Sequence, residues 1–317
     1  MTHRIGFVID PLLSLNPKKD ATLAMMKAAE ERGWQMHYFE QSQMFIANSR
    51  PQCRAQRIHS IDYEASPFAH TENSEILYLG DFDAIFMRKD PPFDMEYIYA
   101  TYMLEKAELE GTLIVNKPSS LRDCNEKLFA TQFPQCCPPL VVSSQADVLR
   151  AFVEAQQDAI LKPLDGMGGT SIFRVKAGDS NMSVIIETLT NYGKTPAMGQ
   201  RFLPEISQGD KRILMIDGQA VPYSLARVPL SGESRGNLAA GGQGVAQPLT
   251  DRDKWIAAEV GPSLVEKGII FAGLDVIGDY LTEINVTSPT CIREIDKAFD
   301  TKIGEHLMTA VANRLGQ

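Results

Sequence analysis

The sequence predicts an α/β domain with a parallel sheet followed by an α+β region, and three observations support this fold class. Short apolar runs alternate with helical segments over the first third of the chain, which is the order that builds parallel sheets. Residues 159–175 then read as a strand, a glycine-rich turn and a second strand, and residues 269–286 read as another strand pair. A chain of 317 residues, 44% of them apolar, has the length of about two domains with packed cores.

The N-terminal elements are expected to alternate between strand and helix. Residues 5–10 and 34–40 read as strands, and Asp20 can cap the helix between them, which Gly33 ends. Strands at 83–87 and 112–116 flank a helix from about residue 94 to residue 110. We expect these strands to form one parallel sheet in a domain of residues 1–118.

The rest of the chain is expected to form two smaller units, residues 119–200 and 201–317. The first unit holds helices near 125–131, 147–156 and 183–190 around the glycine-rich turn. In the second unit, Asp217-Gly218 predicts a tight hairpin turn between strands 211–216 and 220–227, because both residues tolerate positive φ. Thr250 and Asp253 resemble a capping box that starts the next helix. Strands 269–277 and 281–286 and a helix near 301–314 complete the unit.

Composition excludes several classes of protein. A net charge of −9 and a pI near 5.2 argue against nucleic acid or an anionic membrane as the main partner, because such proteins need basic patches. The five cysteines show no metal-binding spacing, which is typical of reduced cytosolic thiols. No apolar run reaches the roughly 18 residues of a membrane span, and the N-terminal run is too short for a signal sequence. We therefore expect a cytoplasmic protein that binds neither nucleic acid nor membrane.

Lys162 and the glycines that follow it predict a phosphate-binding turn. Gly166, Gly168 and Gly169 allow the backbone to approach an anion closely, and Lys162 adds a point charge. The third glycine of the dinucleotide fingerprint is absent, and a strand follows instead of a helix. Gly193-Lys194-Thr195 lacks the first glycine of a Walker loop. The alternative is an ordinary loose hairpin.

Glu283 and Asn285 predict a site for a hard cation. They lie two residues apart on a strand, so their oxygens project from one face, an arrangement that suits Mg²⁺. Asp275 joins them only if the intervening turn has the right parity, and we expect a three-residue loop, 278–280, that places Asp275 opposite Glu283. The sequence leaves this parity open, and a solvated strand face with scattered carboxylates is the alternative.

Residues 229–244 carry five glycines around a single arginine, Arg235. This composition is typical of a mobile segment that brings one cation over a site, so we expect a closing lid that excludes water. A plain connector between elements is the alternative.

Six motifs spread over the chain carry a family resemblance. They are Arg88-Lys-Asp-Pro-Pro-Phe93, Asn116-Lys-Pro118, Leu121-Arg-Asp-Cys-Asn-Glu-Lys127, Leu161-Lys-Pro-Leu-Asp-Gly-Met-Gly-Gly169, Arg235-Gly-Asn-Leu-Ala-Ala-Gly-Gly242 and Leu281-Thr-Glu-Ile-Asn-Val-Thr-Ser-Pro-Thr290. Together they resemble the prokaryotic glutathione synthetase family, essentially from end to end. The resemblance implies an ATP-grasp fold and a homotetramer. It also implies the ATP-dependent ligation of γ-glutamylcysteine and glycine through an acyl phosphate, with Mg²⁺, or Mn²⁺ in its place, as the cofactor.

The resemblance also implies residue roles. ATP contacts are implied for Lys127, Lys162, Gly166, Met167, Gly168, Gly169, Gln200, Arg201, Phe202, Leu203 and Asp210. Within this set the two lysines hold phosphates, residues 200–203 form the adenine hinge, and Asp210 bonds the ribose. Metal binding is implied for Asp275, Glu283 and Asn285. Catalytic cations are implied at Arg212 and Arg235. Substrate contacts are implied for Arg88, Val286, Thr287, Ser288, Pro289 and Thr290.

Two other functions stay open at this point. Another ATP-grasp carboxylate–amine ligase would share the phosphate and metal sites but differ in its acceptor pocket. A non-catalytic ATP-binding protein of the same fold would bind nucleotide without turnover. In many ATP-grasp ligases the hinge begins with glutamate, so Gln200 departs from the wider pattern and the role of its side chain is open.

Overall fold

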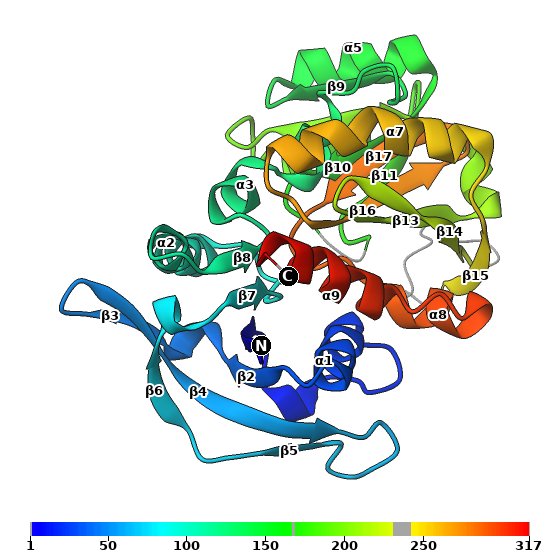
Figure 1. The fold of residues 1–317 in the computed structure, drawn as a ribbon. Helices are drawn as coiled ribbons and strands as arrows, with labels where there is room; N and C mark the ends of the chain where they lie inside the picture. Colours follow the sequence, from blue (N-terminus) through cyan, green and yellow to red (C-terminus); the bar gives the residue numbers. More distant parts are fainter. Residues whose placement is uncertain (1, 167–168, 231–241, 317) are drawn as a thin grey trace.

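The computed structural model describes residues 2–166, 169–230 and 242–316. Within these ranges, three sheets and the helices that cover them build the molecule (Figure 1). None of the described helices is both long and apolar enough to cross a membrane.

The first sheet contains the predicted parallel strands, in the order β2-β1-β7-β8. These are β1 (Arg4–Val8), β2 (Gln35–Phe39), β7 (Ala84–Met87) and β8 (Leu113–Val115). α1 (Ala21–Glu31) begins after Asp20, whose side chain accepts the Leu23 N–H at 3.0 Å, as predicted. α2 (Met95–Leu109) is capped in the same way by Asp94. The alternating pattern and the Asp20 cap therefore predicted these strands and α1 correctly.

The sequence analysis missed an antiparallel extension of this sheet. It consists of β3 (Met44–Ala47), β4 (Arg50–Ile61), β5 (Ala69–Thr71) and β6 (Glu75–Tyr78). β4 pairs with β2 and with the three other strands of the extension, and it forms the long ribbon at the bottom of Figure 1. Buried and exposed residues nearly alternate along β4, which is the pattern of a half-buried strand.

The second sheet is antiparallel, in the order β11-β10-β12-β9. Its strands are β9 (Leu140–Ser143), β10 (Asp158–Pro163), β11 (Phe173–Lys176) and β12 (Ala197–Arg201). β10 and β11 form the predicted strand–turn–strand hairpin. α5 (Ala146–Gln156) and α6 (Met182–Leu189) cover the sheet and share with it a hydrophobic core of its own.

The third sheet has the order β15-β14-β13-β16-β17. Its strands are β13 (Asp210–Ile216), β14 (Gln219–Val228), β15 (Gln243–Pro248), β16 (Phe271–Ile277) and β17 (Tyr280–Asn285). Asp217 and Gly218 have φ of 48° and 77°, so the predicted tight turn is confirmed. The capping box of Thr250 and Asp253 is also confirmed, at the start of α7 (Asp251–Glu266), which lies along one face of this sheet (Figure 1).

The remaining helices follow the first sheet or end the chain. α3 (Pro118–Asp123) and α4 (Glu126–Ala130) follow the first sheet, while α8 (Ile292–Phe299) and α9 (Ile303–Arg314) end the chain. In Figure 1, α9 lies between the first and third sheets, and it shares with α1 a core that includes residues of both sheets. Short 3₁₀ turns occur at Leu12–Ser14, Gln41–Gln43, Leu79–Asp81 and Pro204–Gln208.

Candidate active site

Three strands of the third sheet place Arg212, Asp275 and Glu283 side by side. Arg212 of β13 pairs with Asp275 of β16, and Asp275 pairs with Glu283 of β17. Directly paired residues of antiparallel strands project from the same face, with Cβ atoms about 4.5–5.5 Å apart. Lys211, the neighbour of Arg212, contacts Asp253 of α7 and so points to the other face. The register therefore gathers one guanidinium and two carboxylates on the face away from α7.

The turn between β16 and β17 differs from the prediction. The three-residue loop expected at 278–280 is wrong, because Tyr280 already pairs with Ile277 and the turn holds only two residues. In a regular ladder this turn would put Asp275 and Glu283 on opposite faces of the sheet.

A β-bulge restores the expected pairing of Asp275 with Glu283. The register shifts after Asp275, and Thr282 of β17 is left without a directly paired partner. The Thr282 hydroxyl donates to the Asp275 carbonyl at 3.0 Å and stabilises this irregularity. A bulge inserts one extra residue, which reverses the alternation of side chains beyond it. Asp275, Glu283 and Asn285 consequently share one face.

The next cross-strand pair along the sheet leaves room for the side chain of Arg212. Gly273 pairs with Asn285 and lies beside the long side chain of Arg212. A Cβ atom at Gly273 would lie 2.8 Å from Arg212 Cδ and 3.0 Å from Pro289 Cβ. Because the Arg212 side chain passes so close, position 273 has no room for a side chain.

Two guanidinium groups hold the Asp275 carboxylate. Arg212 Nε donates to Oδ1 at 2.5 Å and its Nη2 donates to Oδ2 at 3.0 Å, while Arg227 Nη2 lies 2.9 Å from Oδ2. Burial by itself would raise the pKa of Asp275, but the charges of Arg212 and Arg227 hold it below its ordinary value. Asp275 is consequently ionised at neutral pH.

Arg227 is a site residue that the sequence analysis missed. Its guanidinium also contacts the carboxylate of Asp210, its direct cross-strand neighbour. An arginine near the end of a strand carries no local signal of such a role, and only the strand pairing shows it. Burial raises the pKa of Asp210 to about 7, against the opposing charge of Arg227. Within the described ranges Asp210 Oδ1 is buried without a hydrogen-bond partner, so it can accept a bond from a ligand.

Two buried lysines reach Glu283 from two different elements. Lys162 Nζ of β10 lies 3.3 Å from Glu283 Oε1, and Lys127 Nζ of α4 lies 3.5 Å from the same oxygen. The Lys127 side chain is only 2% exposed, and the Lys162 side chain is only 5% exposed. Burial would raise the pKa of Glu283, but Lys127 and Lys162 hold it below its ordinary value. The structure thus brings the two lysines predicted to hold phosphates to one point.

Glu126 is a second residue that the sequence analysis missed. Its carboxylate contacts the Lys127 ammonium directly, and burial together with nearby Glu283 raises the pKa of Glu126 to about 7. Neighbouring residues in a helix do not ordinarily face each other, so helical periodicity gave no reason to expect this contact.

The glycine-rich turn lies next to the lysines. Gly166 O accepts a bond from Lys127 Nζ at 3.1 Å, and Gly169 has a φ of 80°, which favours glycine. The predicted contacts of Met167 and Gly168 lie outside the described residues.

The predicted adenine hinge follows β12. The Arg201 N–H donates to Pro139 O and the Phe202 N–H donates to Asp158 O, both at 3.0 Å, so these two donors are already used. Considering the described residues alone, the Leu203 N–H has no acceptor and is the free donor of the hinge. Gln200 is buried within β12.

Arg88 connects the first sheet to the segment of predicted substrate contacts. Its Nη2 donates to Pro289 O at 2.8 Å and its Nε donates to Thr22 Oγ1 at 3.1 Å. Burial lowers the pKa of Arg88 to about 10. In the part of the chain that the structure describes, Arg88 Nη1 is buried without an acceptor.

The other residues of the 286–290 segment follow β17, and two of them contact Arg88 or the nearby Asp90. Thr287 Oγ1 donates to the carboxylate of Asp90, and Ser288 Oγ donates to Arg88 O at 3.2 Å. Val286 is buried and Thr290 is exposed. The structure therefore brings Arg88 to Thr287, Ser288 and Pro289, although they are about 200 residues apart in the sequence.

The predicted lid is anchored by paired strands. Val228 at the end of β14 pairs with Gln243 at the start of β15, so both ends of the glycine-rich segment lie next to each other. The strand β15 itself was not predicted. Arg235, with the rest of residues 231–241, lies outside the described residues, and its catalytic role stays a prediction.

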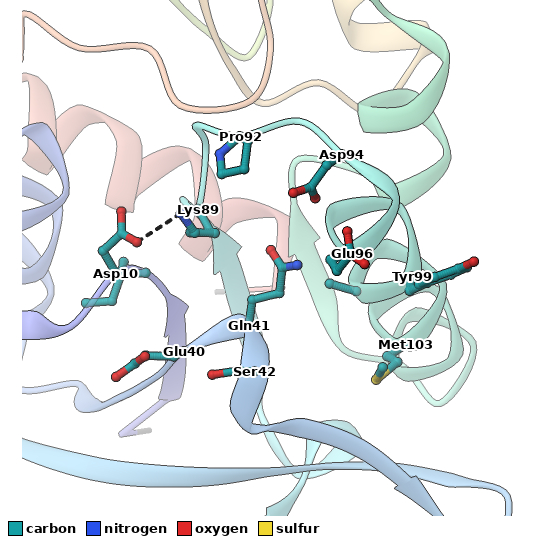
Figure 2. A pocket seen from close by; sticks show the side chains of 12 residues that line it. Asp10, Glu40, Gln41, Ser42, Lys89, Pro92, Asp94, Glu96, Tyr99 and Met103 are labelled. Atoms are coloured by element: carbon teal, nitrogen blue, oxygen red, sulfur yellow. Dashed lines mark ion pairs between the residues drawn. The ribbon is translucent and has the colours of Figure 1, made fainter.

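A cavity of about 410 Å³ is lined in part by Lys89, the residue that follows Arg88 (Figure 2). It is lined at the carboxyl ends of β1, β2 and β7 by residues that include Asp10, Glu40 and Lys89, and along α2 by Tyr99. Lys89 Nζ pairs with Asp10 Oδ1 at 2.9 Å, as Figure 2 shows. This cavity was not predicted from the sequence.

The donor set fits a divalent cation that also binds phosphate. Among the described residues, no three or more His, Cys, Asp and Glu side chains are grouped so that they could hold a metal ion by themselves, and a cation here would rest on Asp275, Glu283 and the amide oxygen of Asn285. Asn285 Nδ2 lies 3.3 Å from Asp275 Oδ2, which shows that these side chains converge. Mg²⁺ ordinarily takes one or two protein carboxylates and completes its octahedron with water and substrate phosphates.

Comparisons with known proteins identify the family of the chain. Residues 3–122 match the prokaryotic glutathione synthetase N-terminal domain, and residues 126–300 match the ATP-grasp domain of the same family. The chain is 59% identical to the glutathione synthetase of Pseudomonas aeruginosa, with 99% of each chain covered. It is 55% identical to that of Vibrio cholerae, with 98% of each chain covered.

Solved structures support the fold. D-cycloserine synthetase DcsG superposes with a TM-score of 0.68 at 13% identity, over 98% of this chain and 99% of that chain. The ATP-grasp ligase PsnB, complexed with a phosphomimetic variant of its minimal precursor, Mg and ADP, superposes with a TM-score of 0.63 at 16% identity, over 99% of this chain and 98% of that chain. The ATP-grasp fold expected from the sequence is confirmed. With matches over nearly its whole length, this chain belongs to the prokaryotic glutathione synthetase family.

Proposed function

We propose that the chain joins γ-glutamylcysteine to glycine at the sheet face described above, with ATP converted to ADP and phosphate. The observation that carries the proposal is the meeting of Lys127, Lys162 and the Arg212–Asp275–Glu283 row in an ATP-dependent ligase of this family. The site collects fixed charges without a nucleophilic serine or cysteine in the row. Such a site suits a reaction in which charge moves between oxygen atoms.

The chemistry has two steps. The C-terminal carboxylate of γ-glutamylcysteine attacks the γ-phosphorus of ATP, and the bond from that phosphorus to the ADP oxygen breaks. The amine of glycine then attacks the acyl carbon, loses a proton and displaces phosphate. Lys127 and Lys162 would hold the nucleotide phosphates, and Arg212 would face the transferring group, because their ammonium and guanidinium groups are in place before reaction.

We further propose Mg²⁺ as the divalent cation, held by Asp275, Glu283 and Asn285. When bound, it would neutralise phosphate charge. The nucleotide would lie with its ribose toward Asp210 Oδ1 and its adenine toward the Leu203 N–H, neither of which has a partner among the described residues. The homotetramer, the cytoplasmic location and the division at residues 118 and 200 stay predictions.

Arg88 is the group we propose for a carboxylate of the peptide substrate. Its buried Nη1 lacks an acceptor among the described residues, and a buried cation with a free donor is costly unless a ligand pairs with it. Its contact with Pro289 O places this donor beside the segment 286–290, the predicted peptide site.

A nucleotide-release assay tests the proposed function. The purified chain is incubated with ATP and Mg²⁺, with γ-glutamylcysteine, with glycine, or with both, and ADP and peptide are measured. ADP and glutathione should form in equal amounts only when both substrates are present. Turnover with other dipeptides or amino acids instead would indicate another carboxylate–amine ligase. ATP binding without any turnover would indicate a non-catalytic protein.

Replacing Gly273 with alanine should impair the reaction. The new methyl group would displace Arg212 or Pro289, since it would lie within about 3 Å of both. A 1 Å misplacement in an active site can cost about 100-fold in rate, so we expect kcat to fall at least about tenfold. Overpacking typically costs about 1–3 kcal/mol of stability, which thermal unfolding would measure. An unchanged kcat would show that Arg212 need not keep its present position.

A further inference from the structure

We propose that Glu126 is a positioning residue that holds the Lys127 ammonium in place for the phosphates of ATP. This inference rests on the proposed function, because it assigns a role within the same nucleotide site. Glu126 is absent from the residues that the family resemblance implied, and the contact that suggests it is visible only in the folded chain.

The Lys127 ammonium is surrounded by three acceptors. They are the Glu126 carboxylate, Gly166 O at 3.1 Å and Glu283 Oε1 at 3.5 Å. A lysine ammonium has three N–H donors; two of them are used by hydrogen bonds to Glu126 and Gly166 O, and Glu283 lies within ion-pair distance. With a side chain only 2% exposed, Lys127 has little access to water that could replace a lost acceptor.

The three acceptors are not equivalent. Glu283 Oε1 is shared with Lys162 at 3.3 Å, and Glu283 is also a proposed metal ligand. Glu126, by contrast, has Lys127 as its sole hydrogen-bond partner within the described ranges. If Glu283 bound the proposed cation, Glu126 would be the carboxylate that remains with Lys127.

The local fold explains why Glu126 can do this. Asn125 caps α4 by accepting the N–H groups of Lys127 and Leu128 at 3.1 and 3.0 Å, and its Nδ2 donates to Leu164 O at 3.2 Å. The start of α4 is thus tied to the segment that leads into the glycine-rich turn. Glu126 and Lys127 follow the cap directly, so both side chains are set on a fixed backbone.

A flexible lysine stem needs such support. Lysine carries a point charge on four methylene groups, and ordering it during binding would reduce affinity. A charge-assisted bond to Glu126 orders the stem before the nucleotide arrives. Removing the charge of Glu126 should therefore weaken the binding of ATP.

The first test is the substitution Glu126→Gln at pH 8, above the raised pKa of Glu126 of about 7, where its carboxylate is charged; glutamine keeps the shape of the side chain and removes that charge. The affinity for ATP, measured by calorimetry without peptide substrate, should fall about tenfold, and KM for ATP should rise by a similar factor. KM for glycine should change less than twofold. The matched control is Glu105→Gln. It removes a carboxylate of α2 that is paired with Arg122 of α3 at 2.9 Å, and it should leave ATP affinity unchanged. An unchanged ATP affinity in Glu126→Gln would overturn the proposal.

The second test separates positioning from a general structural effect. If Glu126 acts through Lys127, then Glu126→Gln should change ATP affinity less than twofold in a Lys127→Met background. A full tenfold loss in that background would overturn the proposal, even with an unchanged unfolding temperature. Failure of the proposed function is a different result, namely no peptide ligation by the unsubstituted chain, and calorimetry still reports the role of Glu126 in that case.

Discussion

Replacing Lys162 with methionine is expected to lower kcat/KM for ATP by about 100-fold or more. Removing one preorganised group that stabilises developing charge typically costs about 10²–10³ in rate. Lys162 Nζ is buried 3.3 Å from Glu283 on a regular strand, so its position is set before ATP binds. Methionine keeps most of the apolar stem and removes the charge, so the effect should fall on catalysis more than on folding.

The adjacent strand offers a matched control for this substitution. Lys176 lies at the end of β11 in the same hairpin, but its side chain is exposed and lies outside the site. Lys176→Met should therefore change kcat/KM less than twofold. Steady-state kinetics and thermal unfolding of both variants would give the comparison. Near-normal turnover in a folded Lys162→Met protein would remove Lys162 from the phosphate site.

Local signals predicted the elements that local chemistry determines. Asp20 and Thr250 cap their helices because a side-chain oxygen satisfies nearby N–H groups, and this requires no distant partner. The extension β3–β6 depends instead on the pairing of β4 with β2, which no short window of sequence shows. α8 was missed for another reason. It begins after Cys291 at a φ of 86° and ends at Asp300 at a φ of 51°, without a side-chain cap at its start.

The site shows the same division. The period of two along a strand was sufficient to put Glu283 and Asn285 on one face. The sheet face on which Asp275 lies depends on a bulge at Thr282. Because of this bulge, a two-residue turn gives the pairing of Asp275 with Glu283 that we expected from a three-residue loop. Arg227 and Glu126 were missed because their partners lie across a sheet or one residue away in a short helix. Tertiary structure, and not residue type, therefore gives these two residues their roles.

The second large effect is expected for Glu283→Gln. Glu283 is the carboxylate on which both lysines and the proposed cation converge, and the amide would remove its charge without changing its size. Groups that merely orient metal ligands typically cost about 10–100-fold when mutated, so loss of a ligand carboxylate should lower kcat about 100-fold or more. The Mg²⁺ concentration for half-maximal activity should also rise at least about tenfold.

Asn285→Asp should have a smaller effect than Glu283→Gln, because an aspartate still offers an oxygen to the cation. The added charge of the aspartate would face Asp275, whose Oδ2 lies 3.3 Å from the present amide nitrogen. This repulsion should offset part of the benefit of the retained oxygen ligand. Asp279→Asn is the matched control, because Asp279 is exposed in the turn of the same hairpin. Magnesium titrations of the three variants should rank them Glu283→Gln, Asn285→Asp and Asp279→Asn, from the highest requirement to the lowest. If Glu283→Gln kept the Mg²⁺ requirement of the unsubstituted chain, Glu283 would serve only to pair the two lysines, and the cation would have to bind elsewhere.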